Sequence, residues 1–257
     1  MSFFVAKLNE LDKRIRIGAV SYLNTIPLLF GLKRSGLMDK LELFEEYPSL
    51  IAEMLLNDQI DLGLVPVTII PQLKEAHILT KYCIATEGEV ASVAIFSEVP
   101  MEEIKKVLLD YQSKTSISLA KILLKEYWQV DVEFEDAKED FRSKIQGTTA
   151  GMVIGDRALE QRNISPYTFD LGSAWKALTG LPFVFAVWVA NKEIGSEFEE
   201  AFNLANGYGV SHIDEVLDEN TYSFYDLKKY YTKNISYQLN DEKRKGMAVF
   251  LEKLKTV

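Results

Sequence analysis

The chain has 257 residues, of which 47% are hydrophobic, and its formal net charge is −9. This composition is typical of a globular protein that can bury a full core, in one large domain or two modest ones. The negative charge argues against nucleic acid as a partner, because binding to phosphate backbones requires a basic face. Every apolar run is shorter than the roughly 20 residues of a membrane helix, so we expect no membrane partner.

The N-terminal stretch MSFFVAKLNELDKR lacks the basic start, long apolar middle and small-residue cleavage site of a secretory signal. We therefore expect a cytoplasmic protein. The single cysteine, Cys83, excludes an internal disulfide and fits a reducing compartment. We interpret Cys83 as a buried bystander because its neighbours are apolar.

Strands and helices alternate through the first 97 residues. The predicted strands are rich in β-branched residues and are followed by helical patterns with early prolines or amphipathic spacing. We predict strands over 14–20, 41–47, 61–67 and 91–97, and helices over 26–32, 48–58 and near 68–76. An irregular stretch is expected between the last of these helices and Gly88.

The alternation restarts after residue 97. We predict strands over 107–110, 131–137, 150–156 and 183–190, and helices over 115–128, 138–146 and 173–180, with a mostly helical remainder. The run 183–190 is continuously apolar, as a fully buried parallel strand would be.

Two successive series of this kind predict an α/β fold with two lobes, each a mainly parallel sheet flanked by helices. We place lobe 1 at 1–97 plus 184–257 and lobe 2 at 98–183, with 91–97 and 183–190 as candidate crossings. A ligand cleft is expected between the lobes. A single doubly wound domain would give a similar alternation.

The first polar cluster is Ser21, Tyr22, Asn24 and Thr25, between the strand 14–20 and the helix that begins at Ile26. Ligands of open α/β sheets bind at this edge, beyond the carboxyl ends of the strands. The alternative interpretation is that Asn24 or Thr25 only caps the helix.

Three further polar clusters could face a ligand. Ser113, Thr115 and Ser116 precede an amphipathic helix, where hydroxyls and free N–H groups can bind an anion; an ordinary cap explains one hydroxyl but not three. Asp156 is by default a helix cap, and Gly155 beside it would let a ligand approach the backbone. Ser92 interrupts a strand, where a serine is usually a hydrogen-bonded structural residue.

Other chemistries have no supporting pattern in the sequence. His77 and His212 lack partner motifs, and no Walker A or G-x-G-x-x-G segment occurs, so we expect no cofactor and no metal. The aromatic run 221–237 is interpreted as helix packing, and the basic run Lys243 to Lys245 as a solvated helix face.

The motifs VSYLNTIPL, DLGLVPV, ASVAIFS, LDYQSKTSISLAKILL, IGD and LTGLPFVFAVW occur together and in this order. From about Arg14 to Trp188 they resemble the chorismate dehydratase family, the first committed enzyme of the futalosine route to menaquinone. That family is similar to type II periplasmic binding proteins in fold. A same-fold enzyme of the route, dihydroxynaphthoate synthase, differs in its opening motif.

The resemblance implies dehydration of chorismate, a dianion, to 3-[(1-carboxyvinyl)oxy]benzoate without a cofactor, with the substrate's enolpyruvyl carboxylate as the base. It implies catalytic roles for Asn24 and Ser92, which would hold that carboxylate, and leaves Asp156 as a rival base. The substrate-binding residues that it implies are Ser21, Tyr22, Thr25, Pro66, Ser113, Thr115, Ser116, Gly155 and Asp156. We expect a monomer or weak homodimer.

Two features depart from the pattern expected of the family: Thr86 replaces an expected serine, and the loop 86–90 is acidic for a site near an anion. The alternatives are a non-catalytic binding protein for a small carboxylate and a same-fold enzyme of the same pathway.

Overall fold

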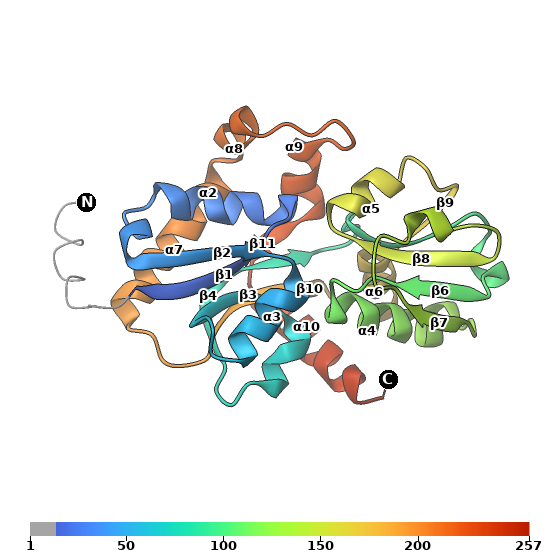
Figure 1. The fold of residues 1–257 in the computed structure, drawn as a ribbon, viewed down its shortest axis with the longest axis horizontal. Helices are drawn as coiled ribbons and strands as arrows, with labels where there is room; N and C mark the ends of the chain where they lie inside the picture. The colour runs from blue at the N-terminus through green and yellow to red at the C-terminus, as the bar shows by residue number, and fades with distance from the viewer. Residues whose placement is uncertain (1–13, 257) are drawn as a thin grey trace. The chain divides into compact units, whose positions relative to one another are not determined.

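Two mixed β-sheets organise the chain in the computed structural model, which describes residues 14–256 (Figure 1). The described residues divide into two units. Unit 1 holds the residues up to Cys83 together with Ala186–Thr221 and Tyr237–Leu239. Unit 2 holds Ile84–Phe185, Tyr222–Ser236 and the residues from Asn240 onward. Each unit is therefore built from separate stretches of the sequence.

The first sheet has six strands in the order β11-β4-β10-β3-β1-β2. Their bounds are β1 Ile15–Val20, β2 Leu41–Glu46, β3 Leu62–Pro66, β4 His77–Thr86, β10 Phe183–Ala190 and β11 Ser236–Gln238. Strand β1 is parallel to both β2 and β3, whereas β10 runs antiparallel to β3. The carboxyl ends of β1, β2 and β3 therefore lie at one edge of this sheet.

In the described part of unit 1 the helices are α2 Ile26–Arg34, α3 Pro48–Leu56, α7 Ser196–Ser211 and α8 Ile213–Glu219, with 3-10 turns at Leu23–Thr25, Met38–Lys40 and Val67–Gln72. Helices α2 and α7 touch through their backbones (Figure 1). A Cβ at Gly31 would lie 1.8 Å from the Ala205 carbonyl oxygen, and one at Gly209 would lie 1.7 Å from that of Pro27. Only glycine allows this approach at either position, so α7 fixes where α2 begins.

A buried carboxylate ties the start of β1 to the start of β3. Asp61 accepts hydrogen bonds from the Arg16 guanidinium at 2.8 Å and from the Lys192 ammonium at 2.6 Å. Burial opposes ionisation of Asp61, but these two cations and the Arg16 N–H lower the pKa of its carboxyl well below the usual range. The interaction stabilises unit 1 only while Asp61 is ionised.

The second sheet has five strands in the order β7-β6-β8-β5-β9. Their bounds are β5 Val93–Ser97, β6 Lys106–Leu109, β7 Glu133–Asp136, β8 Thr149–Ile154 and β9 Tyr167–Asp170. Strand β6 is parallel to β7 and β8, whereas β5 is antiparallel to β8 and β9. A core that includes Phe96, Leu108, Phe141 and Val153 packs against this sheet.

The helices of unit 2 are α4 Lys114–Leu123, α5 Asp156–Gln161, α6 Leu171–Thr179, α9 Leu227–Lys229 and α10 Asp241–Lys253. Helix α4 continues into a π-helical turn at Leu124–Trp128, and α9 continues into one at Tyr230–Asn234. The 3-10 turns are Met101–Glu103, Arg142–Lys144 and Leu254–Thr256. Helices α4 and α6 contact each other.

The α/β prediction is confirmed, and most predicted strands lie where they were expected. The helix expected near 68–76 is only a 3-10 turn over Val67–Gln72, and four further details are wrong. The sheets are mixed rather than mainly parallel; β10 is buried but antiparallel; β4 occupies the stretch expected to be irregular; and 138–146 contains only a 3-10 turn. In that last segment the Asp140 carboxylate accepts bonds from the N–H and guanidinium of Arg142, a local alternative to a helix.

The predicted lobes differ from the two units at Val184–Phe185, which belong to unit 2, and in two longer segments. Residues Ile84–Ser97 belong to unit 2, because β5 pairs with β8 and β9. Most residues after Thr221 also belong to unit 2 rather than to the unit that contains β1. Residues 1–13 of the predicted first lobe, which include nearly all of the stretch behind the cytoplasmic prediction, lie outside the described residues. Within 14–256, no helix is long and apolar enough to span a membrane.

Candidate functional site

The first group of predicted site residues lies at the carboxyl edge of the sheet of unit 1. Ser21 follows β1 directly, is exposed, and donates its N–H to the Glu46 carbonyl at the end of β2. Pro66 ends β3 and is buried opposite Ala186 of β10. Parallel pairing of β1 and β3 thus brings Pro66 and the Ser21 to Thr25 turn to one edge.

The turn at Leu23–Thr25 fixes the side chain of Asn24. The Thr25 hydroxyl donates to Asn24 Oδ1 at 3.2 Å, and the Tyr237 hydroxyl donates to the Asn24 carbonyl oxygen at 3.0 Å. Thr25 is the N-cap residue of α2 but its side chain makes no capping bond, so the alternative that these residues only cap the helix is wrong. Because Oδ1 is occupied, the Asn24 amide presents its Nδ2 donor, which has no partner among residues 14–256.

Thr25 and Tyr22 differ in exposure. Thr25 is 0% exposed, so its hydroxyl reaches Asn24 rather than solvent. Tyr22 is half-buried and its carbonyl oxygen accepts the Thr25 N–H at 3.0 Å, closing the turn. Thr25 is therefore the one buried residue of the turn, whereas Ser21 is exposed and Tyr22, Leu23 and Asn24 are half-buried.

The second group lies at one edge of the sheet of unit 2. Because β5 is antiparallel to β8 and β6 is parallel to it, the start of β5 meets the ends of β6 and β8. The Gly155 N–H donates to the Ser92 carbonyl at 2.9 Å, and the Ile154 N–H donates to the Asp110 carboxylate at 3.2 Å. The structure thus brings Ser92 together with Gly155 and Asp156.

Ser92 is buried, and its polar atoms have defined partners. The Tyr230 hydroxyl donates to Ser92 Oγ at 2.7 Å. The Ser92 N–H donates to the Val90 carbonyl at 2.8 Å, across Ala91, whose φ is +64°. A three-residue turn with a positive φ at a non-glycine centre is rare and strained.

Two partly buried ionic groups hold this strained turn. The Asp170 carboxylate accepts the N–H groups of Val90 at 3.1 Å and Ala91 at 2.9 Å. The Arg162 guanidinium donates to the Ala91 carbonyl at 3.2 Å. Burial raises the pKa of the Asp170 carboxyl, while the N–H donors oppose that shift. The position of Ser92 is therefore set by contacts on both sides of the turn.

The hydroxyls of Ser113 and Ser116, at the N-cap and in the first turn of α4, lie next to each other; Thr115 and Ser116 are within the helix rather than before it. Ser113 is the N-cap residue and accepts the Ser116 N–H at 3.3 Å, and the two hydroxyl oxygens lie 3.1 Å apart. Ser113, Thr115 and Ser116 are all buried. The cap therefore accounts for Ser113, and the hydroxyl of Ser116 bonds to it.

A guanidinium that the sequence interpretation did not use lies next to this helix start. Arg157 Nη2 donates to the Asp110 carboxylate at 2.7 Å and to Gln112 Oε1 at 2.6 Å. Burial raises the pKa of the Asp110 carboxyl, and the Arg157 guanidinium opposes that shift. The signal in the sequence was the basic residue directly after the IGD motif.

Gly155 has a backbone conformation that is specific to glycine. Its φ of +66° and ψ of −150° lie in a region open almost only to glycine. Gly155 is the N-cap residue of α5, so the default interpretation of Asp156 as the cap is wrong; Asp156 is the first helical residue. The Asp156 carbonyl oxygen accepts the Tyr222 hydroxyl at 3.0 Å.

The Tyr231 hydroxyl is buried without a partner in the described part of the chain. Burial together with the charge of Asp156 raises the pKa of this hydroxyl.

The aromatic run 221–237 does more than pack helices. Besides Tyr222 and Tyr230, its Asn234 side chain donates to the Glu89 carbonyl at 3.1 Å. The segment thus bonds to the 86–92 loop and to α5, which the sequence could not reveal because these partners are distant along the chain.

The acidic loop 86–90 is neutralised by cations. Glu87 pairs with Lys243 at 2.6 Å, and Glu89 pairs with Arg162. Lys243 is 1% exposed, so its interpretation as part of a solvated face is wrong. The Thr86 hydroxyl donates to carbonyls of its own loop. The acidity of the loop therefore adds little net charge near Ser92.

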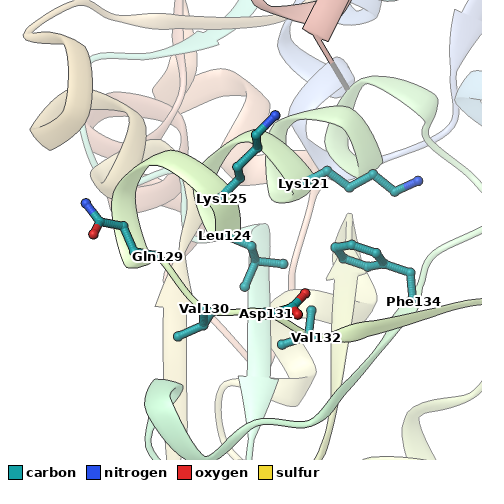
Figure 2. Close-up of a pocket in the computed structure, with 8 residues that line it drawn as sticks. All are labelled: Lys121, Leu124, Lys125, Gln129, Val130, Asp131, Val132 and Phe134. Atoms are coloured by element: carbon teal, nitrogen blue, oxygen red, sulfur yellow. The ribbon is translucent and has the colours of Figure 1, made fainter.

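A cavity of about 660 Å³ lies elsewhere in unit 2, between α4 and its π-helical turn on one side and the β7 segment on the other (Figure 2). Its lining includes Lys121, Lys125, Gln129 and Phe134, and it includes none of the predicted site residues.

No cluster of three or more histidine, cysteine or carboxylate side chains that could hold a metal occurs within 14–256.

Solved structures define the class of fold. A protein from Archaeoglobus fulgidus has a TM-score of 0.75 at 12% identity, covering 96% of this chain and 98% of its own. A Candida albicans protein described as having the generic periplasmic binding protein fold has a TM-score of 0.63 at 14% identity, with coverages of 95% and 90%. The Escherichia coli periplasmic aliphatic sulphonate binding protein has a TM-score of 0.57 at 14% identity, with coverages of 95% and 86%. The chain has the periplasmic-binding-protein fold.

Residues 15–256 match a family described as menaquinone biosynthesis, and the chain belongs to this family. A chorismate dehydratase of Thermus thermophilus is 27% identical over 262 residues, covering 93% of this chain and 94% of the relative. The resemblance and the fold that the sequence motifs implied are both confirmed.

Proposed function

We propose that this protein dehydrates chorismate to 3-[(1-carboxyvinyl)oxy]benzoate in menaquinone biosynthesis. The observation that carries the proposal is the family match over 15–256, joined by a relative named chorismate dehydratase that aligns along nearly its whole length. The placement of the predicted polar residues at strand ends in each unit supports it, because this fold class binds ligands there.

The reaction needs positioning more than strong acid or base catalysis. A base removes the proton from the ring carbon that bears the enolpyruvyl ether, and the resulting charge spreads over the diene and the ring carboxylate. Hydroxide then leaves the neighbouring carbon, so one water is lost and the ring becomes aromatic. In this proposal the substrate's own enolpyruvyl carboxylate is the base, and the protein aligns it and stabilises charge.

Asn24 and Ser92 take the catalytic roles in this proposal. The Thr25 hydroxyl occupies Asn24 Oδ1, so Nδ2 is the atom that donates to a carboxylate. Ser92 can likewise donate its hydroxyl proton, because its Oγ already accepts from Tyr230. Charge-assisted hydrogen bonds of this kind are stronger than neutral ones.

The remaining residues bind the substrate. Ser113, Thr115 and Ser116 place the N-terminus of α4 where it can stabilise a carboxylate. Gly155 lets a ligand approach the backbone, and Ser21, Tyr22 and Pro66 line the edge of unit 1. Thr25 acts by holding Asn24. Asp156 remains the rival proton acceptor. The cytoplasmic location and the monomer or weak homodimer remain predictions.

The first test mixes the purified, metal-free protein with chorismate and follows products by ultraviolet absorbance and mass. We expect loss of one water and a benzoate chromophore. Tight binding without turnover would instead make this a binding protein, and turnover of another anion alone would make it a same-fold enzyme with a different substrate.

The second test is Asn24→Asp, which keeps the size of the side chain but replaces the Nδ2 donor with a negative oxygen beside a dianion. We expect turnover to fall by at least roughly 100-fold, as for loss of a charge-stabilising donor. Asn57→Asp, at an exposed position, is the matched control for added charge and should keep normal turnover. Near-normal turnover of Asn24→Asp would remove Asn24 from the mechanism.

A further inference from the structure

The hydrogen bonds of Ser92 leave one group unused. Its N–H donates to Val90, its carbonyl oxygen accepts from Gly155, and its Oγ accepts from Tyr230. Its own hydroxyl proton has no acceptor in the part of the chain that the structure describes, although the residue is 1% exposed. A buried hydroxyl donor without an acceptor is costly, so an acceptor is expected from a ligand or a water.

Tyr230 decides the direction in which that proton points. Because the tyrosine donates to Ser92 Oγ, the serine cannot donate back along the same line and must direct its proton elsewhere. We propose that Tyr230 is a positioning residue for the dehydration, holding Ser92 as a hydrogen-bond donor to the substrate carboxylate. This inference rests on the proposed function and adds to it a residue that the motifs did not contain.

The surroundings of Tyr230 make its hydroxyl a fixed donor. Tyr230 is 0% exposed and opens the π-helical turn Tyr230–Asn234. Its ring lies 6.1 Å from that of Tyr225 and 5.8 Å from that of Tyr231, measured between centroids. The end of the same turn is bonded to the 86–90 loop, since Asn234 donates to the Glu89 carbonyl at 3.1 Å.

The strained turn before Ser92 completes the arrangement. The positive φ of Ala91 is maintained by the Asp170 carboxylate and the Arg162 guanidinium, so the backbone of Ser92 cannot easily relax toward the tyrosine or away from it. A chain of hydrogen bonds from Tyr230 through Ser92 to a carboxylate would also polarise each bond and strengthen the last one.

The experiment is a double-mutant cycle with chorismate as substrate. kcat and KM are measured for the wild type, Tyr230→Phe, Ser92→Ala and the double variant, with circular dichroism to establish folding at the assay temperature. The matched control is Tyr225→Phe, which removes a hydroxyl of the same segment that donates to Asn234 Oδ1 at 3.1 Å rather than to Ser92.

We expect Tyr230→Phe to lower kcat by about tenfold, the change that one ordinary hydrogen bond produces, with KM altered less. In the Ser92→Ala background the same substitution should change kcat by less than about twofold, because the residue through which it acts is gone. Tyr225→Phe should stay within about twofold of the wild type.

Equal effects of Tyr230→Phe in both backgrounds, or wild-type kcat in Tyr230→Phe, would overturn the positioning role while leaving the dehydratase intact. Absence of chorismate turnover in the wild type would overturn the proposed function and this inference with it. If Tyr230→Phe does not fold at the assay temperature, the four proteins of the cycle are compared at a lower temperature, with the same expected and contradicting results.

Discussion

The orientation of the Asn24 amide provides the sharpest prediction. Thr25→Val keeps the shape of a fully buried side chain but removes the hydroxyl that donates to Asn24 Oδ1 at 3.2 Å. Without that donor the amide can turn over and present its oxygen to the substrate, where a carboxylate requires a donor. We therefore expect Thr25→Val to lower kcat/KM for chorismate even though Thr25 itself is out of reach of a ligand.

The size of the effect follows from the bond that is lost. A neutral hydrogen bond contributes about 0.5–1.5 kcal/mol, which corresponds to roughly a two- to tenfold change in kcat/KM. Thr25→Ser keeps the hydroxyl and should stay within about twofold of the wild type. The assay is steady-state turnover of chorismate, with urea unfolding of each variant to separate activity from stability.

The result that would refute this reasoning is unchanged kcat/KM in Thr25→Val alongside a strongly impaired Asn24→Asp. Asn24 would then matter for turnover without needing its threonine neighbour. A loss in Thr25→Ser as large as that in Thr25→Val would also refute it, because the serine retains the donor.

Three further predictions concern stability. Gly155→Ala should lower the free energy of unfolding by about 1–3 kcal/mol, because alanine is strained at φ +66° and ψ −150°. Gly36→Ala, at an exposed glycine without positive φ, is the control. An equal loss of stability in both variants would contradict the argument. Asp61→Asn should cost about 1–3 kcal/mol at pH 7 in urea unfolding. Because the pKa of Asp61 is lowered on folding, that difference is fully present above about pH 4 and should shrink as the pH falls further; a constant difference would contradict it. Tyr231→Phe should leave the melting temperature unchanged or raise it, since it removes a buried hydroxyl without a partner, and a clear fall would show that the hydroxyl is satisfied.

Local patterns predicted much of the fold. β1, β3 and β8 were recognised from short β-branched runs that end at polar residues, and the helix after Asn24 from its early proline. The same local signals placed Ser21, Asn24 and Gly155 at strand ends, because strand direction alone decides which residues reach that edge. Such features depend on neighbours within a few residues, so a single sequence contains them.

Features that depend on distant partners were missed. The hydroxyl of Tyr230 meets Ser92 across 138 residues of sequence, and nothing near either residue indicates the other. Strand β4 was missed because its sequence, HILTKYCIAT, mixes polar and apolar residues without strict alternation. The direction of β10 was wrong because a strand buried on both faces has the same composition whether it is parallel or antiparallel.

The division of each unit among separate stretches of chain has a consequence for synthesis. Helix α7, whose glycine fixes α2, and strand β10, which pairs with β3, leave the ribosome roughly 100 residues after the first segment of unit 1, a delay of about 5–20 s at ordinary elongation rates. During that interval the apolar edge of β3 and the face of α2 that contacts α7 remain exposed to solvent. The turn that carries Asn24 therefore reaches its final place only when most of the protein has been made, and a nascent chain stalled before Ala186 should require a chaperone.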